Sequence, residues 1–184
     1  MTGTQTIERG IPTGTYAVDS VHSTIDFAVR HAGVSTFRGR FSDYEARLTG
    51  GENPRLSGSV DVNSIEIGEE QLKGHLLSPE FFDAVKFPRL GFESSEIDVA
   101  DDGEVSVRGT LEIGGQSREV EASGHFAQVD SYLDGKARVG LSLATKVDRR
   151  DFGLDWQAEL PSGGQALDWT VEIAVELSLV KEDE

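Results

Sequence analysis

The chain of 184 residues contains no cysteine. Disulfide bonds, zinc–thiolate sites and cysteine nucleophiles are therefore excluded. The chain also lacks an uninterrupted apolar stretch of about 18 residues, the length that a membrane-spanning helix needs. Residues 1–16 contain neither a basic start nor an apolar run, so they do not resemble a secretory signal. We expect the chain as it stands to be cytoplasmic, and periplasmic or secreted only if a leader was removed.

Basic residues are scarce. The chain has 17 Lys and Arg against 33 Asp and Glu, which gives a formal net charge of −16. This charge repels phosphate backbones and anionic headgroups, so we expect no nucleic-acid partner and no stable membrane insertion. Charged residues make up 27% and hydrophobic residues 37% of the chain, which is an ordinary composition for a single soluble domain with one core.

Motifs that carry chemistry are also missing. There is no glycine-rich phosphate loop, HExxH pair, nucleophile elbow or EF-hand loop. The four histidines, His22, His31, His75 and His125, are not spaced i, i+4 for a helix or i, i+2 for a strand. We therefore expect no metal site, no cofactor and no catalytic residue with a local sequence signature.

What the chain does have is alternation of apolar and polar residues. Residues 169–179 are the clearest case, and similar runs joined by short turns recur to give about eight strands. Such spacing predicts an antiparallel sandwich or barrel. Side chains fill a sandwich, whereas an eight-stranded barrel can hold one small ligand, and periodicity alone does not choose between them. The residues expected to point inward are Phe27, Val29, Val60, Val62, Leu90, Phe92, Leu111, Val139, Leu141, Val171, Ile173 and Val175.

Residues 35–50 are predicted to form one strand that bulges or twists at Gly39. Residues 68–88 break the β pattern. Leu72, Leu76 and Leu77 fall on one helical face, Ser78-Pro79 ends that helix, and Pro79 suits the first turn of a short second helix. Because the aromatic and leucine side chains of this segment have no β pattern, we expect them to close or line a barrel.

Residues 148–168 form a long predicted loop, and loops of this length are usually functional or mobile. Arg149 and Arg150 lie in it, close to several acids. Either they form ion pairs with those acids, or Arg149 contacts the polar or anionic head of a ligand. Residues 1–12 are predicted to be a flexible arm, and residues 13–182 a single domain.

Two histidines flank the first long strand. His31 ends the apolar row that carries Phe27 and Val29, whereas His22 falls on the other row. The two are nine residues apart, which is roughly 30 Å in a straight strand. Either ring could contact the polar end of a ligand, or both could hydrogen-bond the backbone and stiffen the end of a barrel.

Four segments resemble those of one family in the same order, from about residue 15 to 180. They are "YAVDSVHSTIDFAVRHAGVSTFRGRF", "HLLSPEFFDAVKFPRLGFES", "VRGTLEIGGQSREV" and "RRDFGLD", the last followed by a final V-x-I strand. In this pattern the chain resembles the YceI-like family of polyisoprenoid-binding proteins.

The resemblance implies an all-β fold, an antiparallel eight-stranded lipocalin-like barrel with one or two short helices, and frequently a homodimer. It implies that the lumen takes up a long isoprenoid chain, and it implies no established reaction. We therefore expect binding, storage or transport of an isoprenoid lipid or isoprenoid quinone-like molecule. The residues expected to line the lumen are Phe27, Val29, Val60, Val62, Leu76, Phe81, Phe82, Leu90, Phe92, Leu111, Leu141, Val171 and Ile173. Those expected near the ligand's head group are His31, His22 and Arg149.

Two alternatives stay open at this point. The first is an enzyme that acts on a sequestered lipid or quinone, with His31 or His22 as its acid–base group. The second is an interaction module whose barrel is filled with side chains. A lumen packed solid would favour the second, and lipid turnover that His31→Ala abolishes would favour the first.

Overall fold

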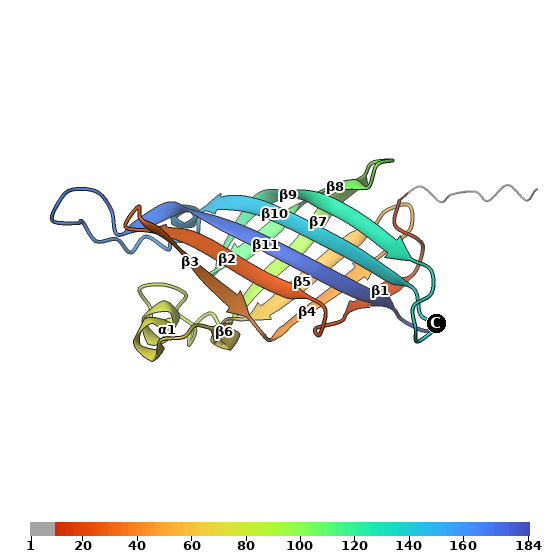
Figure 1. Ribbon diagram of the computed structural model, residues 1–184, viewed down its shortest axis with the longest axis horizontal. Coiled ribbons are helices and arrows are strands. Elements are labelled where there is room, and N and C mark those ends of the chain that lie inside the picture. The colour runs from red at the N-terminus through yellow and green to blue at the C-terminus, as the bar shows by residue number, and fades with distance from the viewer. Residues whose placement is uncertain (1–9) are drawn as a thin grey trace, which may run out of the picture.

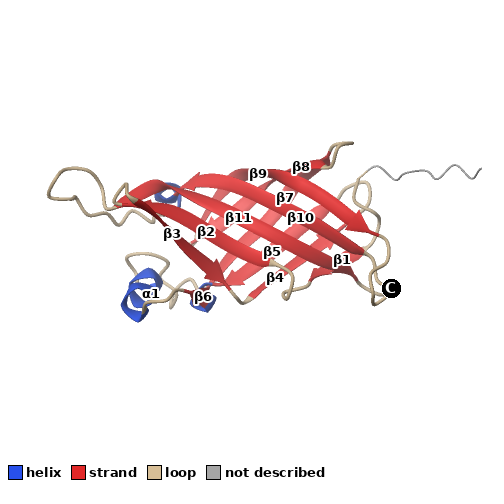
Figure 2. Cartoon of the chain, viewed as in Figure 1, coloured by secondary structure: helices blue, strands red, loops and turns tan. Residues whose placement is uncertain are grey.

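The computed structural model describes residues 10–184 as one elongated antiparallel barrel (Figures 1 and 2). Its elements, in chain order, are β1 (Thr15–Val18), β2 (Thr24–His31), β3 (Ser35–Phe41), β4 (Tyr44–Thr49), β5 (Arg55–Asp61), the 3₁₀ turn η1 (Val62–Ser64), β6 (Ile65–Glu66), α1 (Glu70–Leu77), β7 (Arg89–Val99), β8 (Glu104–Ile113), β9 (Gln116–Val129), β10 (Arg138–Asp148), the 3₁₀ turn η2 (Arg149–Phe152) and β11 (Leu167–Lys181).

Eight of these strands close into a ring. The order β1-β4-β5-β7-β8-β9-β10-β11 is continuous, and β1 also pairs with β11. The predicted eight-stranded antiparallel barrel is therefore confirmed. β11 is long enough to pair with β1 near its carboxyl end and with β2 nearer its amino end, and β3 and β6 continue the sheet beyond β2.

The hairpin of β8 and β9 has a very short turn. β8 and β9 are joined only by Gly114 and Gly115, both with positive φ (58° and 76°). A two-residue turn with positive φ at both positions matches the right-handed twist of a hairpin, and glycine adopts it without steric cost. The Gly-Gly pair in the sequence therefore indicates a hairpin at this position.

The predicted single strand over residues 35–50 is wrong, because it is two strands that do not pair with each other. β3 pairs with β2 and β6, and β4 pairs with β1 and β5. Between them, Ser42 N–H donates to the Ser64 carbonyl, and Asp61 N–H donates to the Asp43 carbonyl. The chain changes neighbours at these two residues. Gly39 lies within regular β3 pairing, opposite Phe27.

The helix predicted from the leucine spacing is α1. Its N-cap is Glu69, whose carboxylate accepts from the N–H groups of Gln71 and Leu72. The second helix expected after Pro79 does not form, since residues 78–87 make successive turns and Asp83 has φ of +51°. The Ser78 hydroxyl donates back to the His75 carbonyl, at the carboxyl end of α1.

Most of the predicted arm, residues 1–9, lies outside the described residues. Of the remainder, Ile11 is buried in the main core cluster, and the Pro12 carbonyl accepts a hydrogen bond from the Tyr16 hydroxyl at 3.2 Å. Residues 11 and 12 are therefore attached to the barrel rather than part of a free arm.

The barrel interior has two parts. The packed half is filled by side chains at most 2% exposed, namely Tyr16, Leu48, Val139, Leu141 and Leu179. The other part encloses a cavity, and we call it the hollow half. Figure 1 shows α1 and the loop before β11 at one end of the barrel, and the chain's carboxyl terminus at the other.

Candidate functional site

The cavity of the hollow half has a volume of about 380 Å³ and an almost wholly apolar lining. Its wall comes from strands on every side of the barrel together with α1, residues 81–82 and residues 152–156. Ligand pockets typically measure roughly 300 to 1,000 Å³ and are mostly apolar with few polar groups. This cavity has the size and the chemistry of a site for an apolar small molecule.

Most residues predicted to line a lumen do line this cavity. They are Phe27, Val29, Val60, Leu76, Phe81, Phe82, Leu90, Phe92, Leu111, Val171 and Ile173. Their contact with a ligand stays a prediction. Period-two alternation in the strands and the helical spacing of α1 indicated most of these positions.

Val62 and Leu141 were expected in the lining, and the structure places them elsewhere. Leu141 is 1% exposed in the packed half, in the same cluster as Leu179. Val62 is fully buried in η1, where its N–H donates to the Pro88 carbonyl. Both are buried, so other atoms of the protein fill the space around them.

Four phenylalanines form one aromatic wall of the cavity. The Phe27 ring centroid lies 6.2 Å from that of Phe37, 5.8 Å from Phe41 and 6.5 Å from Phe82. A Cβ on Gly39 would lie only 2.4 Å from Phe27 Cζ. Glycine there lets the Phe27 ring lie against the sheet, which keeps the space in front of it open. Phe37 and Phe41 were missed, although their alternation in β3 could have indicated them.

A contact between α1 and the loop before β11 covers part of the cavity entrance. The His75 ring lies 4.9 Å from the Phe81 ring and 5.2 Å from the Trp156 ring, and all three side chains also line the cavity. His75 Nε2 is 2.5 Å from the Glu80 carboxylate, which fixes the orientation of the ring. Exposed His31 lines the same entrance, and we call this end, with His31, His75 and Trp156, the mouth.

Arg149 lies at the cavity wall but is 3% exposed and strongly engaged. Its guanidinium donates to four backbone carbonyls, those of Leu154, Trp156, Leu167 and Asp168, at 2.7 to 3.1 Å. It also lies 4.2 Å over the Trp169 ring, and its burial lowers its pKa. Arg149 therefore holds both ends of the loop of residues 153–166, which connects η2 to β11. This contact was not foreseen, because the acceptors are backbone groups.

The neighbouring Arg150 forms the ion pair that the sequence suggested. Its guanidinium lies 2.6 Å from the Asp148 carboxylate, and Asp148 also accepts from the Arg150 N–H as the N-cap of η2. These bonds lower the pKa of Asp148 to about 2. The two adjacent arginines therefore have different partners. Buried Arg149 donates to backbone carbonyls, whereas exposed Arg150 forms an ion pair with a carboxylate.

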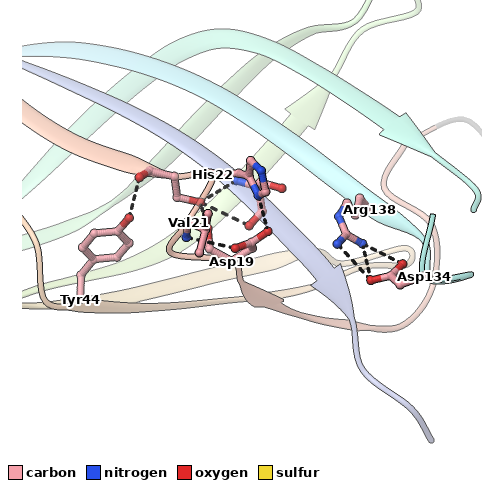
Figure 3. A network of polar contacts seen from close by, with 8 residues as sticks. Asp19, Val21, His22, Tyr44, Asp134 and Arg138 are labelled. Atoms are coloured by element: carbon pink, nitrogen blue, oxygen red, sulfur yellow. Dashed lines mark hydrogen bonds and ion pairs between the residues drawn. The ribbon is translucent and has the colours of Figure 1, made fainter. Parts of the chain in front are cut away.

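His22 was predicted near a ligand head group, and the structure places it away from the cavity. It lies at the opposite end of β2 from His31, outside the cavity lining, with Nδ1 2.8 Å from Asp19 Oδ2 (Figure 3). This bond is the main reason why the pKa of Asp19 is lowered. His22 and His31 therefore cannot act on one ligand atom together.

Asp19, His22 and Ser23 do not form a catalytic triad. The Ser23 hydroxyl donates to the Asp19 carbonyl at 2.6 Å and accepts from Ser178 N–H at 2.9 Å. The Ser23 carbonyl in turn accepts from the Tyr44 hydroxyl at 2.8 Å (Figure 3). These residues tie the turn between β1 and β2 to β11 and β4, which is a structural role.

Within residues 10–184, no helix has the length and hydropathy needed to cross a bilayer. In the same part of the chain, no three histidine, aspartate or glutamate side chains group in a way that could hold a metal ion.

Comparison with known proteins gives matches over nearly the whole chain. A family model described as the YceI-like domain matches residues 16–179. A UPF0312 protein of Vibrio cholerae is 28% identical over 145 residues, covering 76% of this chain and 77% of that protein. A UPF0312 protein of Staphylococcus aureus is 26% identical over 171 residues, covering 89% of this chain and 97% of that protein.

Solved structures with the same fold were also found. BcnA of Burkholderia cenocepacia superposes with a TM-score of 0.74 at 20% identity, covering 88% of this chain and 98% of that one. A polyisoprenoid binding domain from Saccharophagus degradans superposes with a TM-score of 0.71 at 15% identity, covering 91% and 98%. At these identities the superpositions establish the shared barrel.

Proposed function

Because the chain belongs to the YceI-like family, we propose that it binds an isoprenoid or similar long-chain lipid in the cavity of the hollow half, for storage or transport. The observation that carries this proposal is an apolar cavity of about 380 Å³ inside a closed barrel. The structural neighbour from Saccharophagus degradans is described as a polyisoprenoid binding domain, which supports the same class of ligand.

The physical driving force is burial of the tail. Each CH₂ group removed from water contributes roughly 0.8 kcal/mol. The packed half blocks the far end of the lumen, so the tail enters first and the polar end stays at the mouth. Aromatic side chains such as Phe27, Phe82 and Phe92 offer rigid flat surfaces for an unsaturated chain.

We propose that His31 is the polar group nearest to the ligand head. It lines the cavity, and a histidine ring can donate or accept a hydrogen bond in either tautomer. Arg149 is the second basic group at this end, but four of its five N–H groups already donate to carbonyls. Its contribution to a head group is therefore at most one further hydrogen bond and a long-range charge.

The alternative of an interaction module with a filled barrel conflicts with the cavity. An enzyme acting on a sequestered lipid was the other alternative, with His31 or His22 as its acid–base group. Of these two histidines only His31 lines the cavity, because His22 lies at the other end of β2.

The test is native mass spectrometry of freshly purified protein, followed by organic extraction and analysis of the extracted lipids. We expect a co-purified apolar molecule with a long isoprenoid or similar chain, and the same spectrum shows whether the protein forms a homodimer. A matched preparation of Val29→Asp, which places a charge on the cavity wall, should release the ligand. A ligand-free wild type that also fails to take up added isoprenoid lipid would contradict the proposal.

A further inference from the structure

The cavity ends blindly at a ring of five apolar side chains. Ala46, Leu56, Val107, Leu143 and Leu177 line the cavity and also belong to the buried core cluster of the packed half. They come from five different strands, β4, β5, β8, β10 and β11, so they close the bore from several sides. We call these five residues the floor.

Beyond the floor there is no room for a chain. On β11 the next inward residue after Leu177 is Leu179, which is fully buried and does not line the cavity. On β10 the corresponding residue after Leu143 is Leu141, at 1% exposure. Protein interiors of this kind are close-packed, so a tail cannot pass without displacing side chains.

The depth of the cavity follows from strand geometry. Leu167 and Leu177 both line it and are ten residues apart on β11. At roughly 3.3 Å per residue and a strand tilt of roughly 40°, the distance along the barrel axis is roughly 25 Å. The cavity therefore accommodates a bounded length of extended chain.

We propose that the floor acts as a length limit, so that the protein selects a single-chain lipid whose extended tail is no longer than roughly 25 Å. This inference rests on the proposed function. Each chain unit that reaches apolar wall adds affinity, because it leaves water. Units that would lie beyond the floor must remain at the mouth or fold back, and they add little.

Ala46 is the floor position at which a substitution can shorten the cavity. It is the smallest floor side chain, and as a cavity-lining residue it has space in front of it. Ala46→Leu raises the floor into the cavity. Ala174→Leu is the matched control, because Ala174 is on β11 but exposed and outside the cavity lining.

The experiment titrates wild type with geraniol, farnesol, geranylgeraniol and solanesol, in order of length, delivered from cyclodextrin and followed by tryptophan fluorescence, since Trp156 is at the mouth. We expect affinity to rise about tenfold or more per isoprene unit up to geranylgeraniol. Solanesol should bind no more than about twofold tighter than geranylgeraniol, because its added units gain no further burial.

In Ala46→Leu, geranylgeraniol should bind about tenfold weaker while geraniol changes less than about twofold, because only the longer tail reaches the floor. Ala174→Leu should behave like wild type. If Ala46→Leu does not fold, Leu177→Ala gives the opposite test: it deepens the floor and should raise the affinity for solanesol relative to geranylgeraniol.

The outcomes separate the two proposals. A wild type whose affinity keeps rising through solanesol, or an Ala46→Leu variant that weakens geraniol as much as geranylgeraniol, would overturn the length limit but not lipid binding. Absence of saturable binding for all four alcohols would overturn the proposed function itself.

Discussion

The two halves of the barrel interior are lined by the same alternating rows of apolar residues, but side chains fill one half and leave a cavity in the other. On β10, Leu141 belongs to the packed half and Val147 lines the cavity, and both are on the same alternating row. The packed half is closed by Tyr16 of β1 and Leu48 of β4, which enter the bore. The hollow half is instead covered by α1 and the loop of residues 153–166.

This difference shows how a barrel keeps a lumen open. Large side chains from β1, β4, β10 and β11 fill one end of the bore. At the other end, the Phe27 ring packs closely against Gly39, and Arg149 holds the covering loop through carbonyls. An open lumen therefore depends on a few residues that hold the wall and the cover in place, and not on a distinct sequence pattern.

The largest expected effect is at the cover of the hollow half. Arg149→Ala removes four hydrogen bonds and leaves partly buried carbonyls without their donor. We expect a loss of about 4 kcal/mol in the free energy of unfolding by urea denaturation. Arg150→Ala, which removes only an exposed ion pair, should cost less than about 1 kcal/mol. Equal losses would show that Arg149 does not hold the cover.

A direct comparison of the halves uses two side chains of equal size. Leu141→Ala leaves a cavity in close packing and should cost about 3 kcal/mol of unfolding free energy. Ile173→Ala only enlarges an existing cavity, so it should cost about 1 kcal/mol. Urea denaturation of ligand-free protein measures both. Similar costs would mean that the cavity collapses in solution.

Phe81→Ser combined with Phe82→Ser should reduce lipid affinity more than stability. Both rings line the cavity, and each apolar side chain contributes roughly 1.5 to 3 kcal/mol when fully buried. We expect at least about 2 kcal/mol less binding free energy, against about 1 kcal/mol of unfolding free energy. Phe87→Ser is the control, since Phe87 is in the same segment but does not line the cavity. Unchanged lipid retention would count against a role for this segment.

The smallest expected effect is a loss of stability at acidic pH. The pKa of Asp148 is lowered to about 2 from 3.8, so the folded state favours its charged form. Its contribution to stability is therefore present above about pH 4 and is lost as the pH falls to about 2. Because the ion pair is at the surface, this contribution is less than about 1 kcal/mol. Asp148→Asn should destabilise the protein at neutral pH and have no effect near pH 2, as thermal melts across this range would show. A loss of the same size at both pH values would exclude this linkage.

Local alternation was enough to assign the inward rows of the barrel. Alternation is a local steric property of extended backbone, so Phe27, Val171 and Ile173 could be assigned to the interior without any long-range information. The helix over residues 70–77 followed from leucine spacing in the same way. The order of motifs then allowed the family, and with it the closed barrel, to be named.

Alternation does not distinguish the inward residues that line the cavity from those that are packed. Leu141 and Val62 satisfy the same pattern as Val171, but what fills the space in front of a side chain comes from strands far away in the chain. The same holds for Arg149, whose partners are carbonyls up to 19 residues away, and for His22, which a long β2 separates from His31. Alternation is set by each residue's own backbone, whereas filling is set by the closure of the whole sheet, and a one-dimensional pattern carries no information about that.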